Sequence, residues 1–201
     1  MNNIIHYFEI PDNIYNDLME CINDKSTEWN SELAGNIKEE YSLHKYIPKF
    51  ENFLLSQIKD SPYLSKYLND YHILTNPLPL RLVNFWVNFQ KKHEFNPLHK
   101  HTGLLSFVLF MKIPFLMEDE RKLGPGALSN ENTPGCLSFV YPSSEIGGIE
   151  IIKLEVDKKW EKKGVIFRAD LNHIVNPFYS DGTRITISGN MLLENPKSKE
   201  E

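Results

Sequence analysis

The sequence is poor in cysteine and in clustered basic charge, and each shortage argues against a class of protein. Its 201 residues include two cysteines, Cys21 and Cys136, which lie far apart and form no CxxC pair. Neither a disulfide framework nor a zinc site built from thiolates is therefore expected. The net charge is −5 and the basic runs are only pairs, so we expect no surface that binds a nucleic-acid backbone.

Long apolar runs are also absent from the sequence. No stretch approaches the roughly 18 apolar residues that suggest a transmembrane helix, and the opening MNNIIHYFEI lacks the basic and apolar regions of a secretory signal. We therefore expect a soluble protein of the reducing cytoplasm, without a membrane partner. The sequence shows no internal repeat or low-complexity segment, and its length suits a single domain over residues 1–201.

The first part of the chain has the pattern of helices. Over residues 48–60 the apolar side chains recur at three- and four-residue spacings, which places them on one helix face. Asn13 is expected to cap an earlier helix, and Pro62 to open a later one. Residues 1–75 are therefore predicted to form a helical layer that packs on the rest of the chain, which ends in a polar tail at 194–201.

A different pattern begins near residue 80, where apolar and polar residues alternate and β-branched and aromatic types become common. Turns rich in Gly, Pro, Asn and Asp separate six candidate strands: 81–90, 104–113, 136–141, 149–156, 164–168 and 184–193. Strands that follow one another without helices predict a sandwich or barrel, here a mainly β core over residues 80–193.

Two segments of this β region carry further predictions. The first candidate strand places Asn84, Trp86 and Asn88 on one face and apolar side chains on the other. The two amides are expected either to enter a cavity or to pair across the sheet. Residues 116–135 are too polar and too rich in Gly and Pro for a core strand. A loop of that length is often a lid or a binding loop, and its acids, Glu120 among them, are expected to be solvated.

The histidines carry the clearest chemical signal. His99 and His101 stand one residue apart in the segment NPLHKHTG. On an extended segment, residues i and i+2 point to the same face, so both imidazoles can reach one metal ion. The pair alone is equally consistent with the polar face of a strand. His93 is out of step with the pair and is expected to be exposed.

A third histidine and an arginine lie farther along the chain. His173 follows an apolar segment and precedes the turn at 180–182, and Arg184 opens the next alternating strand. A hairpin would bring these two side chains into one cavity, where the arginine could clamp a carboxylate through two parallel hydrogen bonds. Asp170 is expected either to orient His173 or to occupy a turn.

Four short motifs occur in a fixed order within about residues 84–192. They are W-x-N at 86–88, N-x-x-H-x-H at 96–101, H-x-V-x-P at 173–177 and R-I-x-I-S-x-N at 184–190. In this order and spacing the chain resembles the Fe(II)- and 2-oxoglutarate-dependent oxygenases, and among them a prolyl-hydroxylase-like subgroup of bacteria and phages. The resemblance implies a double-stranded β-helix core, also called a jelly roll or cupin-like fold, with the N-terminal helices packed on it.

The resemblance implies a role for each of the three histidines. His99 matches the first iron-ligating histidine and His173 the distal one. His101 stands where most of the superfamily has Asp or Glu, so the chain departs from the pattern at this position. Three-histidine iron sites are chemically reasonable because imidazole suits iron. The predicted metal set is therefore His99, His101 and His173, and whether His101 itself ligates, supports a ligand or leaves a vacant position stays open.

The resemblance also implies the cosubstrate site and the reaction. Arg184 matches the basic residue that pairs with the distal carboxylate of 2-oxoglutarate, and Thr186 matches the hydroxyl residue that supports it. Asn88 and Ser188 complete the predicted cofactor-binding set. The implied activity is a non-haem Fe(II) dioxygenase that uses O2 to hydroxylate a small-molecule or peptidyl substrate while 2-oxoglutarate is decarboxylated to succinate.

Two other functions are consistent with the same residues. A cupin-like fold with three histidines could also be a zinc hydrolase or isomerase, and a barrel without a working metal site would be a non-catalytic binding protein. Arg184 slightly favours the oxygenase, because an isomerase has no need for a carboxylate clamp. The substrate and the oligomeric state are not predictable from these residues.

Overall fold

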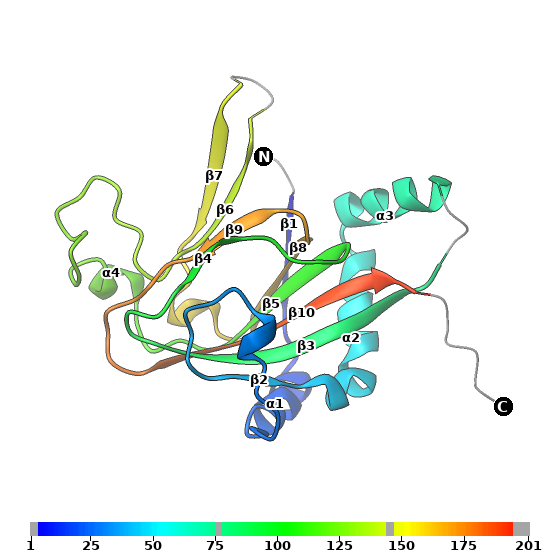
Figure 1. Cartoon of the computed structure of the whole chain (residues 1–201), viewed down its shortest axis with the longest axis horizontal. Coiled ribbons are helices and arrows are strands. Elements are labelled where there is room, and N and C mark those ends of the chain that lie inside the picture. Colours follow the sequence, from blue (N-terminus) through cyan, green and yellow to red (C-terminus); the bar gives the residue numbers. More distant parts are fainter. Residues whose placement is uncertain (1–3, 75–77, 144–146, 195–201) are drawn as a thin grey trace.

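The strands of the chain form two antiparallel sheets that face each other. The computed structural model describes residues 4–74, 78–143 and 147–194 (Figure 1). The larger sheet consists, in spatial order, of β1 (Ile5–Glu9), β8 (Lys163–Arg168), β5 (Leu105–Lys112), β10 (Thr183–Leu193), β3 (Leu80–Lys91) and β2 (Glu40–Ser42). The smaller sheet consists of β4 (Asn96–His99), β9 (Asn172–Val175), β6 (Leu137–Pro142) and β7 (Ile149–Leu154).

The path of the chain through these sheets is that of a jelly roll. From β3 onward the chain passes back and forth between the sheets and remains in one sheet only for the β6–β7 pair. The larger sheet contains β3, β5, β8 and β10, and the smaller one contains β4, β6, β7 and β9. Eight strands distributed in this way over two sheets form a double-stranded β-helix. The predicted fold class, a mainly β jelly-roll core with helices packed on it, is confirmed. All six predicted strands are present, and the short strands β1, β2, β4 and β9 are additions to them.

Three helices cover the outer face of the larger sheet: α1 (Asp12–Cys21), α2 (Ile47–Lys59) and α3 (Pro62–Leu74). In α2, Phe50, Leu54 and Ile58 are buried at the spacing that the sequence predicted. They join one core cluster with Phe85 of β3 and Phe107 of β5, so the helical layer packs directly on the sheet. No helix in the described ranges is long and apolar enough to cross a membrane.

The N-terminal region is not only helical. β1 pairs with β8 at one edge of the larger sheet, and β2 pairs with β3 at the other. The prediction that Asn13 caps the first helix is wrong, because α1 already begins at Asp12. The extended conformation of Pro11, with ψ of 146°, ends the preceding strand and fixes that start. The division into a single domain stays a prediction. The polar tail at 194–201 also stays a prediction, because residues beyond 194 lie outside the described ranges.

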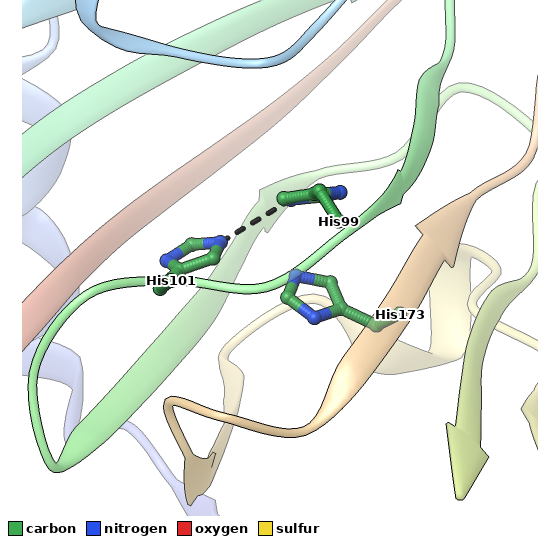
Figure 2. A group of neighbouring side chains, drawn as sticks. All are labelled: His99, His101 and His173. Carbon is green, nitrogen blue, oxygen red and sulfur yellow. Dashed lines mark hydrogen bonds between the residues drawn. The ribbon is translucent and has the colours of Figure 1, made fainter.

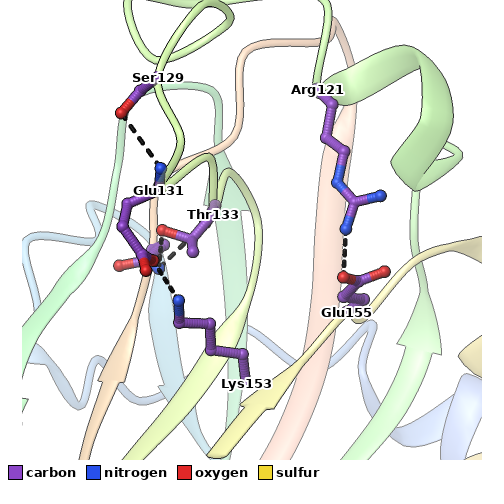
Figure 3. Close-up of polar contacts among 7 residues, drawn as sticks. Arg121, Ser129, Glu131, Thr133, Lys153 and Glu155 are labelled. Carbon is purple, nitrogen blue, oxygen red and sulfur yellow. Dashed lines mark hydrogen bonds and ion pairs between the residues drawn. The ribbon is translucent and has the colours of Figure 1, made fainter. Parts of the chain in front are cut away.

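The loop over residues 116–135 is tied to the smaller sheet. Figure 3 shows an ion pair between Arg121 and Glu155 and another between Glu131 and Lys153. Their partners lie on the smaller sheet, Lys153 near the end of β7 and Glu155 just beyond it. All four side chains are well exposed, so each ion pair contributes only roughly 0–1 kcal/mol to stability. The pairs show where the loop lies against the sheet, but they stabilise it little.

A buried acid anchors the same loop more firmly. The short helix α4 (Met117–Glu120) ends at Glu120, which is fully buried, so the prediction that this acid is solvated is wrong. Its carboxylate accepts hydrogen bonds from the backbone N–H groups of Tyr179 and Ser180 and from the Ser180 hydroxyl. Several donors on one carboxylate offset its loss of hydration. The donors come from a distant segment, which is why the local sequence did not indicate burial.

Candidate active site

A cavity of about 210 Å³ opens between the two sheets. Strands β3 and β10 line it with side chains that the register aligns in pairs: Gln90 with Arg184, Asn88 with Thr186 and Trp86 with Ser188. Asn190 also lines the cavity, and it donates across the sheet to Oδ1 of Asn84 at 3.3 Å. The residues between them face the apolar core under the helices. The alternation predicted for the first candidate strand is therefore confirmed, and its polar face is the inner one.

The structure brings the three predicted metal-site histidines together (Figure 2). His99 ends β4, His101 follows two residues later, and His173 lies in β9 opposite His99. One ring nitrogen from each of the three lies within 4.8 Å of the others. The pairing of β4 with β9 therefore unites residues that are far apart in the sequence.

Hydrogen bonds determine which ring nitrogen is available on two of the histidines. His99 Nδ1 lies 2.7 Å from the carbonyl oxygen of Pro97, and His173 Nδ1 lies 2.9 Å from that of Leu171. A carbonyl oxygen can only accept, so each Nδ1 carries the proton and each Nε2 presents a lone pair. This is the arrangement in which histidine usually binds a metal, with its other nitrogen held by an acceptor.

A side chain orients the third ring. His101 Nδ1 lies 2.8 Å from Oδ1 of Asn190, which also accepts from the Ser106 hydroxyl at 2.8 Å. His101 Nε2 then lies 3.3 Å from His99 Nε2, and neither nitrogen carries a proton to share between them. Two lone pairs that face each other in this way are stabilised by a cation that accepts both, so the three rings fit a metal ion.

Burial keeps these imidazoles in the neutral form that binds a metal. It lowers the pKa of His99, and it lowers the pKa of His101 to about 4 although the bond to Asn190 opposes the shift. Burial, with smaller contributions from His99 and His101, lowers the pKa of His173 well below its usual value. All three rings therefore offer a lone pair at pH 7 without first losing a proton.

Arg184 is buried in the same cavity, with 3% of its surface exposed. Its guanidinium donates to Oε1 of Gln90 at 2.6 and 2.9 Å, and to the carbonyl oxygens of Gly135 and Asn176 at 2.5 and 3.4 Å. These partners are neutral, and no carboxylate in the described part of the chain pairs with it. Burial lowers the pKa of Arg184 to about 10, so it stays charged at pH 7. The charge of the buried acid Glu120 favours the charged form, but its oxygens bond Tyr179 and Ser180 rather than the guanidinium. A buried cation without a directly paired carboxylate fits an anionic ligand.

Asn88 determines the direction of two hydroxyl groups near Arg184. The indole N–H of Trp86 can only donate, and it bonds Oδ1 of Asn88 at 3.0 Å. Nδ2 of Asn88 then donates to the hydroxyl oxygens of Thr186 and Ser188, at 3.1 and 3.4 Å. Because both hydroxyls accept from Asn88, their own protons are available to a ligand in the cavity. Asn88 therefore both lines the cavity and bonds across the sheet.

Two residues considered from the sequence lie outside this arrangement. Asp170 accepts from Arg168 at 2.9 Å while His173 bonds the carbonyl of Leu171, so Asp170 does not orient His173. His93 has a φ of 71° in the turn after β3 and is not part of the cavity wall.

The wall also contains a segment that the sequence did not indicate. The expectation that residues 116–135 form a lid or binding loop is not met, because none of them lines the cavity. Residues from 32–40 do so instead, although that stretch was assigned to the helical layer. It has neither helical nor alternating periodicity, and pairings with distant segments bring it to the site: β2 with β3, and Asn36 with Phe95. Gln90, Asn96 and Asn190 are further wall residues outside the predicted set.

No protein-family model and no curated protein sequence matches the chain. Solved structures match its fold at low sequence identity. A prolyl-4-hydroxylase from Pseudomonas putida has a TM-score of 0.55 and 13% identity, over 96% of this chain and 94% of that one. The chain has the fold of the 2-oxoglutarate oxygenases.

Two further solved structures share this fold with the chain. A prolyl hydroxylase from Trichoplax adhaerens, in complex with a peptide fragment of the hypoxia inducible factor oxygen degradation domain, has a TM-score of 0.55 and 10% identity, over 96% of this chain and 84% of that one. HygX from Streptomyces hygroscopicus, with nickel and 2-oxoglutarate bound, has a TM-score of 0.54 and 11% identity, over 95% and 84%. The resemblance drawn from the four motifs is thus confirmed in the fold.

Proposed function

We propose that this protein is a non-haem Fe(II)- and 2-oxoglutarate-dependent dioxygenase that hydroxylates a substrate bound in the cavity. One observation carries the proposal: three neutral imidazoles and a buried arginine without a directly paired carboxylate meet in a single cavity. The fold shared with prolyl hydroxylases and with a structure that holds 2-oxoglutarate supports it. The peptide in one of these relatives is consistent with a small-molecule or peptidyl substrate.

In this proposal, His99, His101 and His173 hold the metal through their Nε2 atoms. Bound iron would supply the activation of O2 and the oxidation of a substrate C–H bond, coupled to decarboxylation of the cosubstrate to succinate. The chain contributes neutral rings whose orientation is already set by Pro97, Leu171 and Asn190. An imidazole in place of the usual carboxylate leaves the ligand set without a negative charge of its own.

The larger sheet would hold the cosubstrate. Arg184 pairs with the distal carboxylate of 2-oxoglutarate, and the hydroxyls of Thr186 and Ser188 donate to the same ligand. Gln90 and Asn88 keep these groups in place, since they bond Arg184 and the two hydroxyls. The binding energy comes from pairing a charge that is already buried, so no further desolvation of the arginine is required.

Turnover of 2-oxoglutarate tests this proposal. Protein loaded anaerobically with Fe(II) is exposed to O2, and succinate formation is followed for the wild type, for Arg184→Gln and for Arg81→Gln. Arg81 also lies on the larger sheet, but it is exposed and paired with Glu51, so its variant removes the same charge outside the cavity. We expect succinate from the wild type and Arg81→Gln, and a loss of about 100-fold in Arg184→Gln at low 2-oxoglutarate, in the range of a lost buried charge pair.

The all-histidine ligand set also suits zinc, so the metal dependence is part of the same test. Zinc in place of Fe(II) is expected to give no succinate, because it has no redox chemistry. Wild-type protein that binds no 2-oxoglutarate in the presence of any divalent metal would overturn the proposal. Hydrolytic activity supported by zinc and unaffected by Arg184→Gln would support the alternative of a zinc hydrolase.

A further inference from the structure

An acidic side chain faces the cavity from the edge of the larger sheet. Glu40 lies in β2, in register with Asn88 of β3, so both side chains point to the inner face. Only 1% of its surface is exposed. Arg184, on β10, lies on the other side of β3, so the two charges are on different parts of the wall.

Two oxygen atoms in this part of the wall are buried without a hydrogen-bond partner. They are Oε1 of Glu40 and Oδ1 of Asn96, which also lines the cavity. The other carboxylate oxygen of Glu40 accepts one hydrogen bond, from Nδ2 of Asn30 at 3.3 Å. A buried acceptor without a donor destabilises the folded chain, so this pair of oxygens points to a ligand that supplies the donor.

Both unpaired oxygens lie beside Gly35. A Cβ atom on Gly35 would lie 3.5 Å from Oε1 of Glu40 and only 2.4 Å from Oδ1 of Asn96, closer than a real Cβ contact, so the two oxygens meet at one point of the wall and only a glycine leaves space for Asn96 there. No ion pair to Glu40 is found among the described residues. Lys100 also lines the cavity, but it is exposed and its charge is hydrated.

The charge of Glu40 indicates which kind of donor fits. Burial, with a smaller contribution from nearby Glu94, raises the pKa of Glu40 to about 7, so the empty cavity disfavours the carboxylate. A neutral donor would satisfy the hydrogen bond but would leave the negative charge of the ionised carboxylate without a counter-charge. A cationic nitrogen would do both, since it donates and neutralises the charge.

We propose that the cavity binds a substrate carrying a cationic nitrogen, an ammonium or a guanidinium group, which donates to Glu40 and Asn96. Asn96 and His99 are three residues apart on β4, which is irregular between them, so at most roughly 10 Å of chain separates them and the nitrogen is held a few bonds from the carbon to be oxidised. The oxidation step rests on the proposed function, whereas the binding of the cation does not.

The experiment compares probes that differ in charge and little in shape. Binding of n-butylguanidinium and of n-butylurea is measured by ligand-observed NMR titration on the full chain without metal, for the wild type, Glu40→Gln and Glu39→Gln. Glu39 is one residue away and forms ion pairs with Lys25 and Lys91 outside the cavity, so its variant is a matched loss of charge. The wild type and Glu39→Gln are expected to prefer the guanidinium about ten-fold, as for a charge-assisted hydrogen bond, and Glu40→Gln to show no preference.

Equal binding of the two probes to the wild type, or a preference that survives in Glu40→Gln, would overturn this inference. The comparison on the wild type needs no substitution, so a Glu40→Gln variant that fails to fold does not prevent the test. Because no metal or 2-oxoglutarate is present, the outcome is independent of the succinate assay. A preference for the guanidinium in a protein that makes no succinate would support this site and refute only the oxygenase.

Discussion

The two faces of strands β3 and β10 are equally buried and chemically opposite. On the outer face, Phe85, Val87 and Ile187 have no exposed surface and pack under the helices. On the inner face, Asn88 and Arg184 have 5% and 3% of their surface exposed, yet they bond mainly to other polar groups around a cavity. The comparison teaches that burial alone does not identify a core. Buried polar groups cost stability unless partnered, so a face of this kind indicates a place for a ligand.

The largest effect on stability is expected from the outer face. Phe85→Ala removes a ring that contacts Phe50 and Phe107, with ring centroids 5.9 and 6.1 Å away. We expect a loss of about 3–5 kcal/mol in the free energy of unfolding, because the tightly packed site cannot close the cavity left behind. Urea denaturation measures it. A loss below about 1 kcal/mol would mean that the outer face is not the core that stabilises the fold.

The inner face is expected to make stability depend on pH through Glu40. Its pKa is about 7 in the folded protein and 4.5 when unfolded, so the folded state binds more protons between these values. The contribution of Glu40 to the free energy of unfolding therefore falls by up to about 3 kcal/mol as the pH rises from 4.5 to 7. Above pH 7 it changes no further. Glu40→Gln is expected to remove this fall in denaturation curves measured across that range.

Glu39 provides the opposite control for the same measurement. Hydrogen bonds from Lys91 and Lys25 lower its pKa to about 2, so its contribution is present above pH 4.5 and is lost as the pH falls toward 2. Glu39→Gln should therefore lower stability by a constant amount above pH 4.5 and change its pH dependence only below that value. If Glu40→Gln leaves the slope between pH 4.5 and 7 as it is in the wild type, the burial cost assigned to Glu40 is wrong.

A smaller effect is expected where the inner face supports a histidine. Asn190→Ala removes the acceptor that orients His101 and also bonds Ser106. Groups that hold a metal ligand in place typically contribute 10–100-fold to metal affinity. We expect a loss of that size in equilibrium dialysis against Mn(II), with little change in the midpoint of thermal unfolding. Unchanged affinity would mean that His101 does not ligate the metal.

The smallest effect is expected from a single hydroxyl of the cosubstrate site. Thr186→Val keeps the shape of the side chain but removes the group that accepts from Asn88 and is available to donate to 2-oxoglutarate. A hydrogen bond to a charged group is worth about 1.5–3 kcal/mol, and Arg184 still pairs with the carboxylate, so we expect a loss near the lower end of that range, about 10-fold in 2-oxoglutarate affinity by calorimetry. The same substitution should leave metal affinity unchanged, which separates the two parts of the site.

Much of this contrast between faces was predictable from the sequence. Alternation alone placed Asn84 and Asn88 opposite Phe85, because side chains on a strand point to its two faces in turn. The His-x-His spacing predicted a shared face for His99 and His101. Local periodicity is enough for such statements, since they concern neighbours on one strand.

The remaining features depend on contacts between distant segments. Glu40 reaches the cavity only because β2 pairs with β3, and Glu120 is buried only because its donors are Tyr179 and Ser180. The lone pairs of His99 and His173 meet because β4 pairs with β9. Nothing in the local pattern around these residues encodes which strand becomes a neighbour, so the sequence alone predicted neither the wall at 32–40 nor the buried acid.

Metal binding tests the central claim most directly. Anaerobic dialysis against Fe(II) is measured for the wild type, for alanine variants of His99, His101 and His173, and for His93→Ala as a control outside the cavity. The account predicts one ion per chain in the wild type and in His93→Ala, and a loss of about 100-fold or more in each of the other three. A wild-type chain that binds no Fe(II), or a His173→Ala chain that binds it as tightly as the wild type, would contradict it.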